Sequence, residues 1–88
     1  MKTPTPPAHR RHSLLATLYF EPASTARVST LVGQMECVHS IVVSTALVRA
    51  DLMWLQEVEL VRFKDDTATL TERGRDVAMG RAQFPEVG

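Results

Sequence analysis

The segment from Ser44 to Val58 constrains the fold most, because its apolar residues recur at the spacing of one helical face. Ser44 is a favourable N-cap, so a helix is predicted over Thr45–Glu57. The inward face of this helix comprises Leu47, Val48, Leu52, Trp54, Leu55 and Val58. The outward face comprises Thr45, Ala46, Arg49, Ala50, Met53, Gln56 and Glu57. A helix with one apolar side needs other elements to cover that side.

Two further helices are predicted before this segment. The first covers Arg10–Phe20 and ends before Pro22; its apolar side comprises Leu14, Leu15, Leu18 and Tyr19. The second covers Thr25–Val38, with Ser24 or Thr25 as its N-cap. Its inward side comprises Val28, Leu31, Val32, Met35 and Val38. The residues from His39 to Val43 are expected to connect it to the third helix.

A hairpin and a last helix are predicted after the third helix. Leu60–Phe63 and Thr67–Leu70 are β-prone runs on either side of the polar turn Lys64–Asp66. Thr71 can cap a helix over Glu72–Gln83. Its packed side would comprise Gly74, Val77, Ala78 and Arg81. The sequence therefore predicts a mainly helical α+β fold in the order helix, helix, helix, hairpin, helix.

The chain has 88 residues, which is enough for one small domain. The proline-rich residues 1–8 are expected to form a disordered tail, residues 9–84 the domain, and residues 85–88 a second tail. No apolar run approaches the roughly 20 residues of a membrane span, and no signal peptide is recognisable. Cys37, the single cysteine, cannot form an internal disulfide, so we expect a cytoplasmic protein.

Three helices followed by a hairpin is the order of the winged helix-turn-helix. The stretches Val43–Ser44, Val48–Leu55, Leu60–Val61 and Ala68–Ala82 closely resemble small winged-helix proteins of Mu-like phages and prophages, often described as ArsR-like regulators. The similarity covers about residues 10–87 and is strongest from Ser44 onward. It implies a winged-helix fold and a role in DNA binding and transcriptional regulation.

Two positions depart from the pattern of these proteins. Glu59 stands where the family usually closes the third helix with glycine, which adopts a left-handed cap at least cost. Metal-sensing relatives need paired thiolates on one helix, whereas this chain offers only Cys37. No metal site and no cofactor are therefore expected.

The outward face of the third helix is the predicted DNA surface, because groove readers place polar side chains there and cations toward phosphates. The residues expected to face bases are Thr45, Ala46, Arg49 and Met53. Those expected to contact phosphates are Arg10, Arg11, Arg62 and Lys64, with Lys2 on the tail. Ten basic and ten acidic residues give no net charge and an isoelectric point near 6.8, so phosphate contacts must be few or confined to a local patch. An ordinary solvated helix face is the alternative interpretation.

Asp51 falls inside the apolar stripe of the third helix, where an unpaired carboxylate would be costly. A buried ion pair with Arg73 or Arg27, or a bond to backbone amides, is favoured over a catalytic or metal-binding role. Trp54 is predicted to anchor the core between the third helix and the hairpin.

The other candidate chemical groups are interpreted as structural. His9 and His12 could share a helix face but make an incomplete zinc site, and His39 lies apart from them. Cys37 is expected to be a small buried apolar side chain. No catalytic motif is recognisable, so an enzyme is not predicted.

Two functions remain open from the sequence. The first is DNA binding, with a homodimer expected because one small domain buries little DNA surface. The second is a non-enzymatic protein-interaction module in phage assembly or DNA packaging, since Ala50 and Met53 leave an apolar spot on the outward face.

Overall fold

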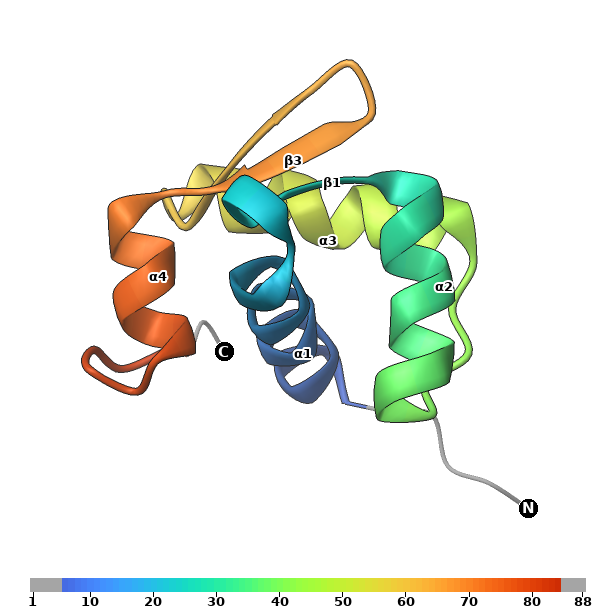
Figure 1. Ribbon diagram of the computed structural model, residues 1–88, viewed down its shortest axis with the longest axis horizontal. Helices are drawn as coiled ribbons and strands as arrows, with labels where there is room; N and C mark the ends of the chain where they lie inside the picture. Colours follow the sequence, from blue (N-terminus) through green and yellow to red (C-terminus); the bar gives the residue numbers. More distant parts are fainter. Residues whose placement is uncertain (1–5, 85–88) are drawn as a thin grey trace.

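A computed structural model describes residues 6–84 of the chain, and these form a mainly helical α+β fold (Figure 1). The elements in order are α1 (Pro7–Phe20), the 3-10 turn η1 (Pro22–Ser24), β1 (Thr25–Arg27), α2 (Val28–His39), α3 (Thr45–Glu57), β2 (Val61–Lys64), β3 (Thr67–Leu70) and α4 (Glu72–Ala78). The three strands form one antiparallel sheet in the order β1-β3-β2. None of the helices in this part of the chain is long and apolar enough to span a membrane.

The predicted third helix and the hairpin are confirmed, with the first strand shifted by one residue to Val61–Lys64, so that Lys64 belongs to the strand and not to the turn. The bounds of α3 match the prediction, and the Ser44 hydroxyl accepts a hydrogen bond from the Leu47 amide at 3.0 Å, as an N-cap should. Strands β2 and β3 pair antiparallel around the turn Asp65–Asp66. Both turn residues have positive φ, as a two-residue type I′ turn requires.

The predicted start of the second helix is wrong. Residues Thr25–Arg27 form β1, and α2 begins at Val28 with no side-chain cap. β1 pairs with β3, and this pairing buries Ala26 opposite Ala68. Backbone pairing with a distant strand therefore outweighs a local helical pattern. Val38, predicted to face inward, is 64% exposed at the other end of α2.

Both ends of the described chain also differ from the prediction. α1 begins at Pro7, inside the predicted tail, because proline is favourable in the first helical turn, where its missing amide is not needed. α4 ends at Ala78 rather than Gln83, and Gly80 follows with φ of 79°. Arg81, predicted to pack, is exposed. Most of the predicted tails, with Lys2, lie outside the described residues.

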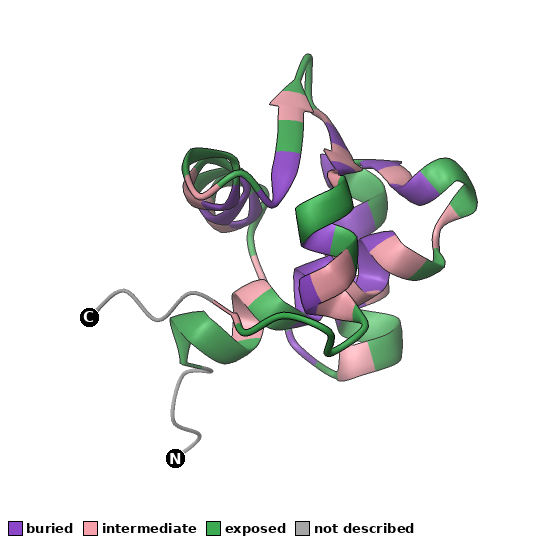
Figure 2. Ribbon diagram, turned by 90° about the vertical axis from the view of Figure 1, so that its left-hand side faces the viewer, coloured by how far each residue is buried: buried purple, intermediate pink, exposed green. Residues whose placement is uncertain are grey.

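The core is built around α1. In Figure 1, α4, α1 and α2 lie side by side, while α3 and the sheet cross one end of this layer. Leu14, Leu15 and Leu18 of α1 are fully buried, and Figure 2 shows the buried segments of the elements turned toward one another. The apolar sides of α3 and the sheet meet this centre through Val48, Leu52, Leu55, Leu60, Val61 and Ala68. The outward face of α3 and the outer face of the sheet are thereby left to solvent.

Left-handed residues close both helices that flank the α2–α3 turn. Ser40 ends α2 with φ of 57°, and the following Ile41 is buried. Glu59 follows α3 with φ of 65°, and the Leu60 amide donates to the Leu55 carbonyl at 2.9 Å. The conformation usually given to glycine is therefore retained with glutamate in its place.

Gly74 is where α4 comes closest to the α3–β2 junction. A Cβ at this position would lie 1.9 Å from the carbonyl oxygen of Leu60, a distance that no side chain tolerates. Gly74 and Val77 are buried, as predicted. The glycine thus allows α4 to close the core beside the start of β2.

Candidate nucleic-acid interface

The outward face of α3 is exposed along its length. Val48, Asp51, Leu52 and Leu55 are buried, whereas Thr45, Ala46, Arg49, Ala50 and Met53 face solvent. The predicted inside and outside of this helix are therefore confirmed. Met53 is 59% exposed, and Arg49 is the one cation of α3. With Gln56 and Glu57, which are also exposed, the face carries two charged groups of opposite sign, one hydroxyl, one amide and several small or apolar groups.

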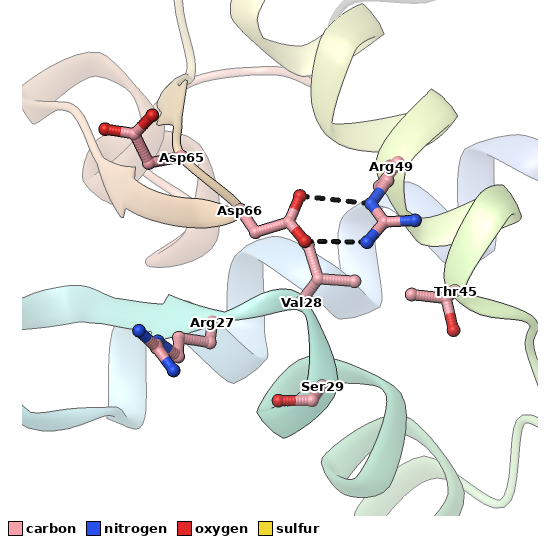
Figure 3. A pocket seen from close by; sticks show the side chains of 7 residues that line it. All are labelled: Arg27, Val28, Ser29, Thr45, Arg49, Asp65 and Asp66. Atoms are coloured by element: carbon pink, nitrogen blue, oxygen red, sulfur yellow. Dashed lines mark hydrogen bonds and ion pairs between the residues drawn. The ribbon is translucent and has the colours of Figure 1, made fainter.

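Arg49 forms a two-point ion pair with Asp66 of the hairpin turn. Its Nε donates to one carboxylate oxygen at 3.0 Å and its Nη2 donates to the other at 2.6 Å (Figure 3). The side chains are 46% and 53% exposed, respectively. The hydrogen bonds lower the pKa of Asp66 and raise the pKa of Arg49, and the nearby charge of Arg27 also lowers the pKa of Asp66. The pair joins α3 to the hairpin.

A surface pocket of about 280 Å³ lies beside this pair (Figure 3). It is lined by Arg27, Val28, Ser29, Thr45, Arg49, Asp65 and Asp66. These residues come from the β1–α2 junction, the first turns of α3 and the hairpin turn. Three segments distant in the sequence therefore meet at one solvent-facing concavity.

The outer face of the sheet carries a row of cations that the sequence analysis found only in part. The strand register sets Arg27 opposite Thr67 and Thr67 opposite Lys64, and residues directly opposite share one face. The next row is Thr25, Thr69 and Arg62, and the Thr25 and Thr69 hydroxyls lie 3.0 Å apart. We name this six-residue surface the cationic sheet face.

Three of its members, Arg27, Arg62 and Lys64, are exposed cations, and the other three are threonines. Arg62 and Lys64, predicted to contact phosphates, are exposed on this face. Thr25 and Arg27 were missed because a helix was predicted over Thr25–Val38, and without that third strand the shared face with Thr67 and Thr69 could not be foreseen. The alternation of polar and small residues, Thr-Ala-Arg and Thr-Ala-Thr, was the available signal for two strands sharing a face.

Arg10 and Arg11, predicted to contact phosphates, instead bind Asp51. Arg10 donates to both carboxylate oxygens, from Nε and, at 2.9 Å, from Nη2; Arg11 Nε donates at 3.1 Å. The side chains of Arg10, Arg11 and Asp51 are 12%, 23% and 2% exposed. The hydrogen bonds that Arg10 donates to the Asp51 carboxylate raise the pKa of Arg10. We name these three residues the Asp51 cluster and leave them outside the interface.

The predicted ion-pair partners of Asp51 are thus wrong, although a buried ion pair is confirmed. Arg73 lies 3.5 Å from Glu59 instead, and Arg27 belongs to the cationic sheet face. The sequence showed that Asp51 needs a partner but not which arginine supplies it, because α1 meets α3 only in the tertiary structure.

Trp54 lies at the edge of the core rather than at its centre. It is half-buried, the Arg11 guanidinium lies 4.3 Å from its ring centroid, and Phe84 stacks on it at 5.8 Å. Trp54 thus packs against the core, as predicted, but from its edge. Its ring contacts Arg11 of the Asp51 cluster on one side and Phe84, which follows α4, on the other.

The remaining candidate groups do not converge. Cys37, predicted to be buried, is exposed on α2. The Nε2 of His39 and the Thr17 hydroxyl lie 3.0 Å apart, and His12 packs against the Phe84 ring. Within residues 6–84, no group of three or more His, Cys, Asp or Glu side chains could hold a metal ion.

Comparisons of the chain with protein-family models, with curated proteins and with solved structures found no match.

Proposed function

We propose that this chain is a winged-helix DNA-binding protein of the phage or prophage type, in which α3 enters the major groove and the hairpin contacts the backbone. The observation that carries the proposal is the continuity of two surfaces. The outward face of α3 meets the cationic sheet face at the hairpin turn, where Arg49 and Arg27 line the same pocket.

The order of elements supports the winged-helix assignment. Helices α2 and α3 are joined by the five residues 40–44, and the hairpin follows α3 directly. β1 pairs with β3 and extends the hairpin into a three-stranded sheet. This pairing also places Arg27 level with Lys64 across the sheet. The fold thus provides cations on both edges of the wing.

The distribution of charge supports contact with phosphates although the net charge is zero. The arginines of the Asp51 cluster neutralise a buried carboxylate, and Arg49 neutralises the exposed carboxylate of Asp66. Arg27, Arg62 and Lys64 then remain as the cations of the sheet face. Three phosphate contacts per chain predict a slope of about −3 when the logarithm of affinity is plotted against the logarithm of salt concentration.

The test is a titration of fluorescent duplex DNA at several salt concentrations. The double variant Arg62→Ala, Lys64→Ala should reduce the slope to about −1 and weaken binding to all sequences. The control Arg73→Ala, Arg81→Ala removes the same charge from exposed positions at the α4 end, and should leave the slope unchanged. An absence of binding at about 50 mM salt would contradict the proposal. Sedimentation with and without DNA tests the homodimer expected on DNA.

The exposure of Met53 favours one second candidate, a protein-interaction module in phage assembly or packaging. Met53 is 59% exposed beside Ala50, and an exposed methionine suits an apolar protein contact better than a phosphate. Binding to purified phage structural and packaging proteins tests this candidate. Met53→Glu should abolish such binding, whereas Met79→Glu, at a methionine 41% exposed after α4, should not.

A further inference from the structure

The hairpin turn fixes Arg49 from the side and leaves the end of its guanidinium open. Asp66 accepts from Nε and Nη2, which occupy one edge of the planar group. No hydrogen bond to Nη1 is found among residues 6–84, and the third nitrogen points away from Asp66 in Figure 3. Two N–H groups on Nη1 and one on Nη2 therefore remain available as donors.

Asp66 is itself held by three elements. It is the second residue of the type I′ turn, with φ of 57°. Its backbone carbonyl accepts from the Val28 amide at 3.0 Å, which ties the turn to the first residue of α2. Its carboxylate binds α3 through Arg49. The Asp66 carboxylate is thus held in place and restricts the Arg49 side chain. Arg49 therefore loses less conformational freedom on binding a ligand than an unrestrained arginine would.

The donors on the open edge of the guanidinium match the acceptors of one particular base, guanine. Nη1 and Nη2 present two parallel N–H donors, and guanine presents O6 and N7 as two acceptors in the major groove. A phosphate would also accept these bonds, but a phosphate contact does not require a carboxylate such as that of Asp66 to fix the guanidinium plane. A fixed plane matters where the acceptors are coplanar and belong to a single base pair.

We propose that Asp66 is a positioning residue that holds Arg49 for two-point recognition of a guanine. This inference rests on the proposed function, because it names the base that the α3 surface reads. Arg49 should select guanine over other bases at one position by about fivefold or more. Asp66 should supply that selectivity while opposing binding in general, since its charge repels phosphates.

The hairpin turn offers a matched control. Asp65 and Asp66 are adjacent, both exposed and both at positive φ, but only Asp66 contacts Arg49. Asp65→Asn and Asp66→Asn remove the same charge, and asparagine adopts the left-handed conformation readily. In Asp66→Asn the amide nitrogen would face the guanidinium donors, so the two-point pair is lost. Arg49→Lys keeps the positive charge on α3 but removes the two parallel N–H donors of the guanidinium.

The experiment incubates the full chain and each variant with a randomised duplex library at about 50 mM salt and sequences the bound fraction. The wild type and Asp65→Asn should enrich the same sequence with a guanine at one position. Asp66→Asn and Arg49→Lys should lose the preference at that position, and Asp66→Asn should still bind the bulk library at least as tightly as the wild type. Thermal melting of each variant verifies that it is folded.

Three outcomes overturn the inference. If Asp66→Asn and Asp65→Asn raise affinity alike with an unchanged guanine preference, Asp66 acts only through charge. If the wild type retains the library without any base preference, Arg49 reads no base, while DNA binding itself stands. If no DNA is retained, the proposed function fails and the inference fails with it.

Discussion

Asp51 and Asp66 each accept hydrogen bonds from arginine, but they lie in very different surroundings. The Asp51 side chain is 2% exposed and bound by two arginines, whereas Asp66 is 53% exposed and bound by one. The first pair joins α1 to α3 within the protein, and the second joins α3 to the hairpin at the surface. The same two side-chain types therefore serve stability in one place and the orientation of a surface group in the other.

Solvent explains the difference. Breaking a buried pair leaves a charge without water or a partner, which is strongly destabilising. Breaking an exposed pair returns both groups to water, so the free energy of unfolding changes little. A position whose loss affects function without affecting stability is more informative about ligand binding, and we expect Asp66 to be such a position.

Replacing Asp51 should give the largest effect and tests the structural half of the comparison. Asp51→Ala should lower the free energy of unfolding by about 3 kcal/mol, because Arg10 and Arg11 would each lose a buried carboxylate partner. Denaturant titration measures the loss. Asp66→Asn is the control, because asparagine tolerates the left-handed turn, and it should leave the midpoint nearly unchanged. Equal losses in the two variants would mean that the exposed pair stabilises the fold as much as the buried one.

Replacing each arginine of the Asp51 cluster should give intermediate effects that rank its contacts. Arg10→Ala should lower the free energy of unfolding by about 2 kcal/mol, since Arg10 binds both carboxylate oxygens and is the less exposed arginine. Arg11→Ala should lower it by about 1 kcal/mol, through one hydrogen bond and the contact with Trp54. Thermal melting of Arg10→Ala and Arg11→Ala measures both losses. Arg62→Ala is the control and should not change the stability. The reverse ranking would mean that the indole contact dominates.

Replacing Glu59 extends the comparison to a third, weaker pair. Glu59 lies 3.5 Å from Arg73, and both side chains are more exposed than the Arg49–Asp66 pair. Glu59→Gly should raise the free energy of unfolding by about 0.5–1 kcal/mol, because relief of the left-handed strain exceeds the loss of the pair. Glu57→Gly, inside α3, should lower it by about 1 kcal/mol. Destabilisation by Glu59→Gly would assign the ion pair a larger role.

The pH dependence of the Arg49–Asp66 pair should be the smallest effect. The pKa of Asp66 is lowered from its ordinary value of 3.8 by the hydrogen bonds from Arg49. The contribution of the pair is therefore complete above pH 3.8 and is lost as the pH falls through the lowered pKa. Carboxyl-carbon NMR should show this low titration, and Arg49→Ala should return the pKa of Asp66 toward 3.8. An unchanged titration in that variant would mean that the pair does not form in solution.

The sequence predicted the elements whose local signals are strong. α3 was predicted to the residue because Ser44 caps it and its apolar face is continuous, and the hairpin followed from two β-prone runs around a polar turn. The need of Asp51 for a partner was also visible, since a carboxylate within an apolar stripe cannot remain alone. These features depend on residues that are close in the chain.

Tertiary structure decided what depends on distant residues. Thr25–Arg27 became a strand because β3 offered unpaired backbone groups, and that pairing set Arg27 beside Lys64. The choice of Arg10 and Arg11 for Asp51, and of Asp66 for Arg49, required α1 and the hairpin to be packed against α3. Local propensity specifies a helix face, but only the packing of elements determines which charges are neutralised within the protein and which remain for a ligand.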